Sequence, residues 1–235
     1  MNSSVVFYLS KMDSDISQNA IQPYLESPNV HAVMVEEWSG PKLHKVIPSP
    51  IGACRSFYVP VAKEWTKLSI TSTPFLNRTS KVYGCFNGNT GGHRNRVQAR
   101  KFLQGRCGSN CFFCRDQDSH HLHISNYHDE MTRFKLVFMP FGNAYERFAT
   151  FEALWLGLIV VMIDWPGAAE AYQGLPVVRI RKFDDINRRN IELWVASFTE
   201  VLTDLPRFRR TRLTMAAWSR RIDGIASGID GNWSR

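Results

Sequence analysis

The sequence of 235 residues lacks any long hydrophobic run. A membrane-spanning helix needs about 20 consecutive apolar residues, whereas one of the longest apolar stretches, residues 153–163, is bracketed by Glu152 and Asp164. The first residues also lack the basic segment that precedes the apolar core of a signal peptide. We therefore expect no membrane span, a first strand at residues 5–9 and a soluble, cytoplasmic protein.

Cysteine is scarce and odd in number. Three of the five cysteines fall within residues 107–114. Disulfides within so short a segment could not stabilise a domain of this size. We therefore expect free thiols in a reducing compartment. We therefore do not expect the N-glycosylation sequons to be modified, because N-glycosylation requires entry into the secretory pathway. They lie at Asn2, Asn77 and Asn232.

The composition does not suit a disordered or fibrous chain. Hydrophobic residues make up 44% and charged residues 21%, which are ordinary values for a globular protein. Basic residues are in excess, since 29 Lys and Arg against 21 Asp and Glu give a formal net charge of +8. This excess predicts an anionic partner, and a nucleic acid, a phosphorylated metabolite and an acidic glycan all fit.

Short apolar runs alternate with helical segments, a rhythm typical of a parallel sheet flanked by helices. Residues 40–52 are rich in glycine and proline and are expected to be mostly loop. A polar stretch at 71–80 predicts a boundary between a small domain, residues 1–78, and a larger one, residues 79–235. Strands are predicted at residues 5–9, 31–35, 81–86, 121–125, 134–139, 159–163 and 176–180, and helices at 19–25, 97–103, 127–133, 147–156, 166–172, 190–202 and 207–225.

The first of two unusual loops in the larger domain joins a predicted strand to a predicted helix at residues 87–96. Its glycines let backbone amides approach a ligand, and the helix start and the arginines add positive charge. It is neither a GxGxxG fingerprint nor a Walker loop, and a solvated turn before a helix remains the alternative. The candidate donor-binding residues here are Asn89, Gly91, Gly92, Arg94 and Arg96.

The second loop follows the apolar run 134–139 and leads into another helix. It contains Gly142 and Asn143, and the helix region adds Arg147 and Glu152. Arg147 could pair with phosphate oxygens, while Glu152 could accept hydrogen bonds from ribose hydroxyls. An intrahelical ion pair is the alternative, but a separation of five positions suits it poorly.

These loops carry a pattern that extends over roughly residues 41–180. Its positions are Pro41, Lys42, Ile47, Pro48, Pro50, Ile51, Gly52, Cys85, Phe86, Asn89, Arg94, Pro140, Gly142, Asn143, Arg147, Glu152, Ala153, Leu154, Gly157, Ile159, Val160 and Val161. The pattern resembles the exostosin-like glycosyltransferases, whose usual form is a strand, S-P-R-G-N-G, a His-Arg pair, a Glu, and then A-L-x-x-G-x-I-P-V-V. The most specific part is the Gly-Asn-Arg-Glu core.

The sequence also departs from that family. Phe141 stands where the family usually has Arg, and Glu146 precedes Arg147 where the family usually has His. Arg94, Arg96 or Arg181 could replace the missing cation near the donor phosphates. The chain is short for the family and lacks the membrane anchor of its Golgi members, so it is more similar to the compact soluble transferases of large algal viruses.

The resemblance implies a GT-B-like enzyme with two Rossmann-like halves, the N-terminal one reduced. Such an enzyme moves a sugar, for example xylose, from a UDP-sugar to a glycan or glycoprotein acceptor with inversion. The second half holds the nucleotide sugar, and basic groups stabilise the leaving diphosphate, so no metal or other cofactor is required. The base that accepts the acceptor proton is expected among Glu36, Glu37 and Asp13, although exposed carboxylates at a strand end are the alternative.

Rival interpretations remain open. The spacing C-x3-C-x2-C of Cys107, Cys111 and Cys114 is that of a radical SAM cluster, and the same cysteines with His120 could bind zinc. The arginine-rich stretch 207–221 could contact nucleic acid, but no nucleic-acid module accompanies it, so we expect no such partner. A degenerate fold that only binds glycans is a third possibility, which the departure at Phe141 leaves open.

Overall fold

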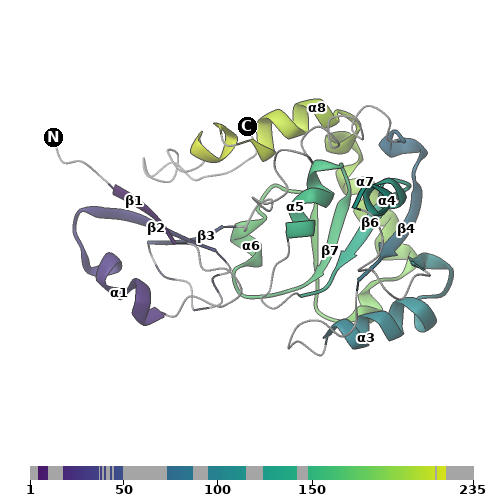
Figure 1. Cartoon of the computed structure of the whole chain (residues 1–235), viewed down its shortest axis with the longest axis horizontal. Helices are drawn as coiled ribbons and strands as arrows, with labels where there is room; N and C mark the ends of the chain where they lie inside the picture. The colour runs from purple at the N-terminus through teal and green to yellow at the C-terminus, as the bar shows by residue number, and fades with distance from the viewer. Residues whose placement is uncertain are drawn as a thin grey trace. The chain divides into compact units, whose positions relative to one another are not determined.

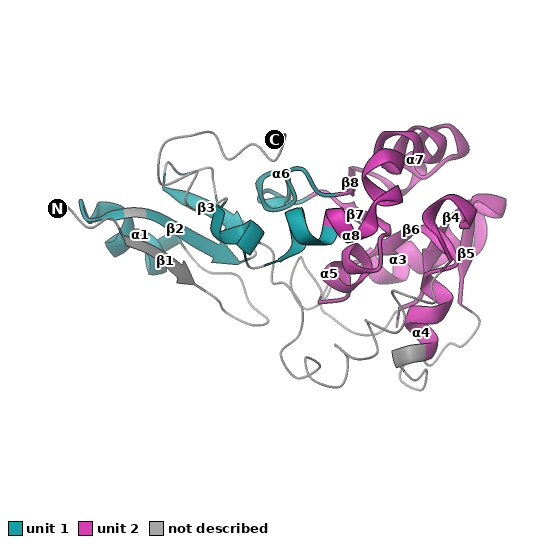
Figure 2. Ribbon diagram, turned by 90° about the horizontal axis from the view of Figure 1, so that it is seen from above, with its two compact units in different colours: residues 1–51, 165–175, 209–235 teal, residues 52–164, 176–208 magenta. Residues whose placement is uncertain are grey.

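The computed structural model describes residues 5–9, 18–36, 38, 40, 43, 45–49, 73–86, 95–114, 124–141, 148–214 and 216–220. The chain divides into two compact units, which Figure 2 colours separately. Unit 1 comprises residues 1–51, 165–175 and 209–235, and unit 2 comprises residues 52–164 and 176–208. The division into domains at residues 1–78 and 79–235 stays a prediction.

Unit 2 is built on a sheet of five parallel strands (Figure 1). β6 (Phe134–Met139) and β7 (Ile159–Ile163) lie inside this sheet, and nearly all of their side chains are buried. Parallel strands covered on both faces need near-continuous apolar runs, and both strands begin and end where the sequence predicts. The other strands are β4 (Thr79–Gly84), β5 (Cys111–Phe113) and β8 (Val177–Ile180).

Helices flank both faces of the sheet in unit 2. α4 (Ile124–Met131) and α5 (Phe148–Trp155) pack against β6 on one side, and α7 (Arg188–Thr203) packs on the other (Figure 2). The predicted α/β class, with a Rossmann-like parallel sheet flanked by helices, is therefore confirmed for this unit. The remaining helical segments are α3 (Asn95–Lys101), α8 (Leu205–Phe208), a π-helical turn at Phe102–Arg106, and 3-10 turns at Phe75–Asn77, Gly108–Asn110 and Phe183–Asp185.

The strand order of unit 2 creates a point where the chain reverses direction across the sheet. The order is β5-β4-β6-β7-β8, so the chain first steps from β4 to β5 and then returns past β4 to β6. In open α/β sheets, ligands bind outside the carboxyl ends of the strands at such a switch point. The two candidate loops follow the two strands, β4 and β6, that meet there.

A glycine ends α5 and turns the chain into β7. Gly157 has a φ of 74°, its N–H donates to Leu154 O at 3.0 Å, and the next N–H, of Leu158, donates to Ala153 O at 3.0 Å. This pair of bonds is the Schellman termination of a helix. The buried guanidinium of Arg78 donates to two more carbonyls there, of Leu156 and Gly157, each at 3.1 Å. The end of α5 is therefore fixed by both backbone and side-chain donors.

Unit 1 contains a smaller parallel sheet in the order β1-β2-β3. β2 (Val30–Glu36) packs with α1 (Gln18–Glu26) around a core centred on Ile21, Val33, Val35 and Trp38. Lys45 Nζ donates to the carbonyls of Leu25 and Ser27, and these bonds hold the end of α1. The other elements are β1 (Val5–Leu9), β3 (Val46–Ser49), α6 (Ala168–Ala171) and a π-helical turn at Arg209–Leu213.

Two sequence predictions of secondary structure are wrong, and one short strand was not predicted. Residues 124 and 125, expected at the end of a strand 121–125, begin α4, and the strand that precedes α4 is β5. The segment 40–52, expected to be mostly loop, also contains the unpredicted short strand β3, which tolerates Pro48 because it lies at the edge of its sheet. The single helix expected at 207–225 is replaced by α8, a π-helical turn and a helical stretch at residues 216–220.

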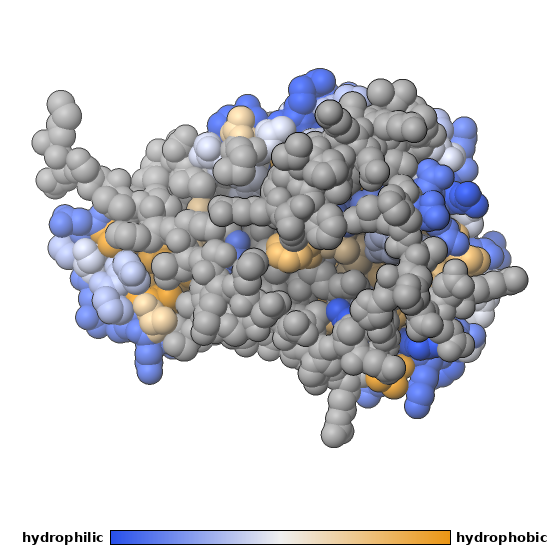
Figure 3. All heavy atoms as spheres, in the orientation of Figure 1, coloured by the Kyte–Doolittle hydropathy of each residue, from blue (hydrophilic) through white to orange (hydrophobic). Residues whose placement is uncertain are grey.

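No helix among the described residues is both long and apolar enough to cross a membrane. Figure 3 shows both hydrophilic and hydrophobic described residues on one face of the molecule. The large hydrophobic side chains that are most exposed are Leu76, Leu193, Val97 and Val201.

Candidate functional site

A cavity of about 270 Å³ lies at the carboxyl ends of three strands of unit 2. Phe141 comes from the segment after β6, Ile163 ends β7, and residues 181–183 follow β8. The first turns of α3 close another side with Asn95 and Gln98. The volume is close to the lower end of the range of small-molecule sites, about 300–1,000 Å³. The cavity therefore occupies the edge of the sheet where ligands of this fold class bind.

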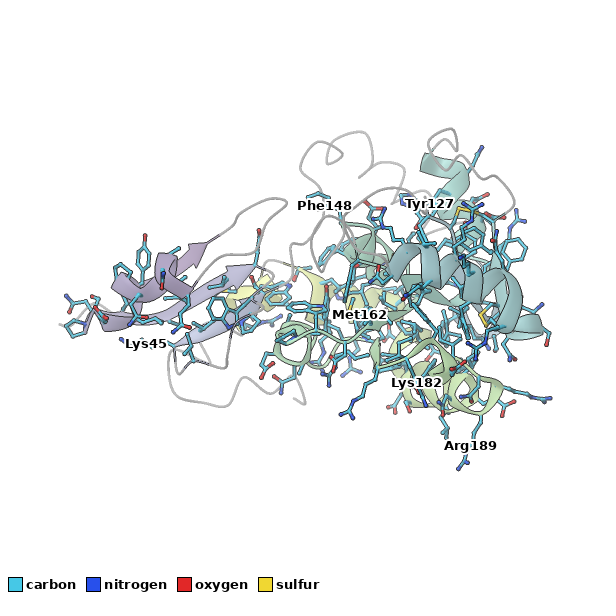
Figure 4. The ribbon with its side chains drawn as sticks, turned by 90° about the horizontal axis from the view of Figure 1, so that it is seen from below. Lys45, Tyr127, Phe148, Met162, Lys182 and Arg189 are labelled. Carbon is cyan, nitrogen blue, oxygen red and sulfur yellow. A yellow bond between two sulfur atoms is a disulfide. The ribbon has the colours of Figure 1, made fainter. Side chains whose placement is uncertain are left out.

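Two cations, Arg181 and Lys182, line this cavity. Both side chains are exposed, and neither makes an ion pair with the described part of the chain. Their backbone N–H groups both donate to Asp185 Oδ2, at 3.1 Å each, so the carboxylate fixes the turn without neutralising either side chain. Lys182 is labelled in Figure 4. Two unpaired cations beside a cavity can accept an anionic ligand.

Two neighbouring arginines, unlike Arg181 and Lys182, make ion pairs with described residues. Arg106 pairs with Asp184 at 2.9 Å, and Arg179 pairs with Asp164 at 3.2 Å. Of the two acidic residues nearest in sequence to the cavity cations, Asp184 thus pairs with Arg106, while Asp185 accepts hydrogen bonds from the backbone of the cavity cations.

The amide of Asn95 is another polar group of the cavity, beside Arg181, Lys182 and Gln98. Its Oδ1 and Nδ2 are both shielded from solvent and have no hydrogen-bond partner among the described residues. Buried polar atoms are nearly always hydrogen-bonded. An unpaired amide offers one acceptor and two donors, a combination that suits the edge of a heterocycle or a sugar.

Arg96, one of the sequence-predicted donor residues, has a different observed partner. Its side chain is 6% exposed, and Nε donates to the carbonyl oxygen of Phe141 at 2.6 Å. This bond ties the first turn of α3, which follows the loop after β4, to the segment that follows β6. The residue therefore braces the edge of the cavity, and its expected contact with phosphate stays a prediction.

Glu152, expected to accept hydrogen bonds from ribose, lies buried in α5. Its Oε2 is 3.1 Å from Nε2 of His128, a fully buried residue of α4. The pair joins the two helices on one face of the sheet. Sequence reasoning missed His128, because no spacing rule connects positions on different helices.

Glu36, the candidate base, ends β2 in unit 1. It lies opposite Ser49 of β3 in the sheet register, so the two side chains share one face of the sheet. Glu36 is 6% exposed and Ser49 is 2% exposed. Ser49 Oγ has no hydrogen-bond partner within the described residues. The alternative of an exposed carboxylate at this strand end is therefore wrong for Glu36.

The other sequence-predicted site residues lie outside the described residues. This group comprises both glycine-rich loops apart from Arg96, two of the three candidate bases and the histidine of the rival zinc site. They are Asn89, Gly91, Gly92, Arg94, Gly142, Asn143, Arg147, Glu37, Asp13 and His120.

The four described cysteines form two disulfides, drawn as yellow bonds in Figure 4. Cys85 pairs with Cys114, with a Cα–Cα distance of 5.2 Å, and Cys107 pairs with Cys111, with a distance of 5.7 Å. The expectation of free thiols is therefore wrong for these residues. The parallel pairing of β4 with β5 brings Cys85 and Cys114 together, since Cys114 N donates to Gly84 O at 3.0 Å.

The disulfides also remove the thiolates on which the metal alternatives depend. A radical SAM cluster needs three thiolates from this segment, and a zinc ion needs deprotonated cysteine sulfur. Among the described residues, no group of three or more His, Cys, Asp and Glu side chains is arranged to hold a metal ion. The interpretation of Cys107, Cys111 and Cys114 as ligands of an iron-sulfur cluster or a zinc ion is therefore wrong for the disulfide-bonded chain.

Tyr83 is a buried polar residue that the sequence did not single out. Its hydroxyl donates to Glu130 Oε2 at 2.8 Å, and its ring stacks with Phe112 and Phe134. Burial, reinforced by the bond to Glu130, raises the pKa of Tyr83 above its ordinary value, so the hydroxyl stays protonated. The residue joins β4, β5, α4 and β6 and has a structural role.

In comparisons with known proteins, no protein-family model matches the chain, and no curated protein matches it significantly.

Proposed function

We propose that the chain is a glycosyltransferase whose unit 2 binds a nucleotide-diphosphate sugar at the cavity after β6, β7 and β8. The observation that carries this proposal is the pair of cations, Arg181 and Lys182, unpaired within the described residues beside a cavity at the ligand-binding edge of a Rossmann-like sheet. A diphosphate is the part of the donor that needs such cations.

The cavity offers complementary groups for the rest of the donor. The unpaired amide of Asn95 can bond to a base or a sugar, and the ring of Phe183 can pack against a flat base. The sequence pattern around Gly142, Asn143 and Arg147 supports a sugar nucleotide over other nucleotides, because it resembles that of exostosin-like transferases. We take UDP-sugars as the donors to be tested first.

The proposed reaction follows from the donor and the acceptor. The acceptor hydroxyl attacks the anomeric carbon, the bond from that carbon to the diphosphate breaks, and the diphosphate leaves with the bonding electrons. Arg181, Lys182 and the loop arginines stabilise the charge on the leaving diphosphate, which makes a metal dispensable for this step. A base must take the proton of the acceptor hydroxyl.

Glu36 is the base that we favour. It is a buried carboxylate at the carboxyl end of a parallel strand in unit 1. In the GT-B-like arrangement that the resemblance implies, the N-terminal half holds the glycan or glycoprotein acceptor. A carboxylate in that half is therefore the expected proton acceptor for an inverting transfer.

The donor site is tested by titrating the purified chain with UDP-sugars, UDP and inorganic phosphate, using calorimetry and thermal unfolding. A ligand that binds only the native state raises the unfolding temperature. We expect the double variant Arg181→Ala/Lys182→Ala to weaken UDP-sugar binding by about 10-fold to 100-fold, since each charge-assisted bond contributes about 1.5–3 kcal/mol before solvent screening.

The matched control is Arg189→Ala, which removes one positive charge from α7 outside the cavity. Arg189 is exposed, and Figure 4 shows it extending away from the sheet. The control should change affinity less than twofold, roughly the scale of a screened distant charge. Equal losses in both variants, or no stabilisation by any nucleotide sugar, would contradict the proposed site.

Transfer itself is tested by incubating the chain with a UDP-sugar panel and following UDP release. Release that depends on an added glycan supports the transferase. Tight donor binding with no release would favour the rival interpretation of a module that binds without catalysis.

A further inference from the structure

One sequon, Asn77-Arg78-Thr79, lies in the described part of unit 2, between a 3-10 turn and β4. Asn77 ends the turn Phe75–Asn77, and Thr79 begins the strand. Both side chains are exposed, whereas Arg78 between them is 5% exposed. The two residues that an oligosaccharyl transferase recognises therefore lie outward on either side of a buried residue.

The turn that carries Asn77 is firmly attached to the rest of unit 2. The Arg78 guanidinium donates to Thr73 O at 2.7 Å as well as to the end of α5, and the ring of Phe75 is 5% exposed. The backbone N–H of Asn77 donates to Pro74 O at 2.9 Å. These contacts hold the neighbours inward and leave the Asn77 amide without a described partner, so a sugar attached there displaces nothing from the core.

An exposed apolar residue, Leu76, lies beside the acceptor. Leu76 is 60% exposed, the largest exposed fraction among the exposed large hydrophobic residues of the described chain. A single exposed leucine is ordinary on a protein surface and does not by itself indicate a cover. The first sugar of an N-linked glycan presents an apolar ring face and an acetamido methyl group, which can cover a neighbouring leucine.

The disulfides supply the chemical environment that the modification needs. Cys85–Cys114 and Cys107–Cys111 account for every described cysteine. Disulfides form in oxidising compartments and are rare where thiols are kept reduced. N-glycosylation takes place in an oxidising compartment as well. A reducing, cytoplasmic environment would argue against glycosylation of the sequons. The two disulfides argue against such an environment.

We propose that Asn77 is an acceptor for N-linked glycosylation and that the chain folds in an oxidising compartment. In the transfer, the side-chain nitrogen of Asn77 bonds to the anomeric carbon of a lipid-linked oligosaccharide. The bond from that carbon to the lipid pyrophosphate breaks, the pyrophosphate leaves with the electron pair, and the amide loses one proton. The lipid-linked donor and the transferase belong to the cell, and the inference does not depend on the proposed sugar transfer by this chain.

The test uses the full chain behind a cleavable secretory leader in eukaryotic cells, with Asn2→Gln and Asn232→Gln to leave one sequon. Glycopeptide mass spectrometry should find most molecules glycosylated at Asn77, and peptide-N-glycosidase should convert that residue to Asp. Asn77→Gln and Thr79→Ala should abolish the glycan, while Thr79→Ser should retain it because serine also completes the sequon.

Non-reducing peptide maps of the same protein should contain both disulfides. Folded, secreted protein with both disulfides and an unmodified Asn77 would overturn the acceptor assignment. The same peptide analysis, applied to protein from the cells that naturally make it, tests the compartment: reduced cysteines with a bare Asn77 would overturn the inference as a whole.

Discussion

The sheet of unit 2 leads at its carboxyl end into two exposed cations, Arg181 and Lys182, whereas the sheet of unit 1 ends in a buried carboxylate, Glu36. Both sheets are parallel, so both gather the residues after their strands at one edge. The chemistry gathered there differs. Exposed cations suit binding of an anion, and a buried carboxylate suits transfer of a single proton. The comparison predicts that substitutions at the two edges separate binding from turnover.

The largest expected effect is at the edge of unit 1. Glu36→Gln keeps the size of the side chain but removes the proton acceptor, so we expect the rate of sugar transfer to fall by about 10²–10⁴-fold. Donor affinity, measured by calorimetry, should stay within twofold, roughly the error of such comparisons. Glu26→Gln, at an exposed position in the same unit, is the control and should retain full activity. An unchanged transfer rate in Glu36→Gln, with donor binding intact, would contradict the assignment of proton transfer to the edge of unit 1.

The next effect concerns the turn from α5 into β7, at the amino end of the strands of unit 2. Gly157→Ala places a Cβ 2.8 Å from Leu205 Cδ1 at a residue with φ of 74°. We expect the free energy of unfolding to fall by about 1–3 kcal/mol, measured by urea denaturation. Gly105→Ala is the matched control, because nothing lies within 4 Å of the added Cβ. A loss in the control equal to that in Gly157→Ala would show that the α5 termination has no special role.

A smaller effect is expected at the cavity itself. Asn95→Ala removes an amide that has no described partner, so the unfolding temperature should hold or rise slightly while donor affinity falls about 5-fold to 10-fold. Asn126→Ala, at an exposed position on α4, is the control for loss of an amide. Lower stability with unchanged affinity in Asn95→Ala would indicate a structural amide and remove it from the donor site.

The smallest effect is expected in unit 1, away from its edge. Lys45→Met keeps the apolar stem and removes the ammonium that donates to Leu25 O and Ser27 O, so we expect a loss of about 1 kcal/mol in unfolding free energy. Amide hydrogen exchange should locate this loss in α1, with donor binding in unit 2 unaltered. A change in donor affinity larger than that of Asn95→Ala would mean that the edges do not act separately.

The sequence predicted the interior of the larger sheet well, because β6 and β7 are continuous apolar runs that only a covered strand explains. It did not predict β5 or β3. β5 has three residues, and β3 contains a proline, so neither offers a periodic signal. Short edge strands form because a neighbouring strand pairs with them, and that neighbour is not visible in the local sequence.

The site was predicted only in part, for a related reason. Arg181 was singled out, but Lys182, Phe183 and Asn95 join it only once the strand order brings β8 and α3 to the same edge. The disulfide between Cys85 and Cys114 likewise depends on the pairing of β4 with β5. Spacing along the chain cannot reveal contacts that the order of a parallel sheet creates.

The Cys85–Cys114 bond has a practical consequence for any assay of this chain. It joins the residue after β4 to the residue after β5, across a sequence separation of 29, and a cross-link of this length stabilises a fold by about 3–4 kcal/mol on loop-entropy grounds. Cys85 also stands just ahead of the glycine-rich segment 87–94. Buffers that contain thiol reductants would therefore break the cross-link between the ends of β4 and β5. Activity measurements belong in reductant-free buffer, with a reduced sample beside it for comparison.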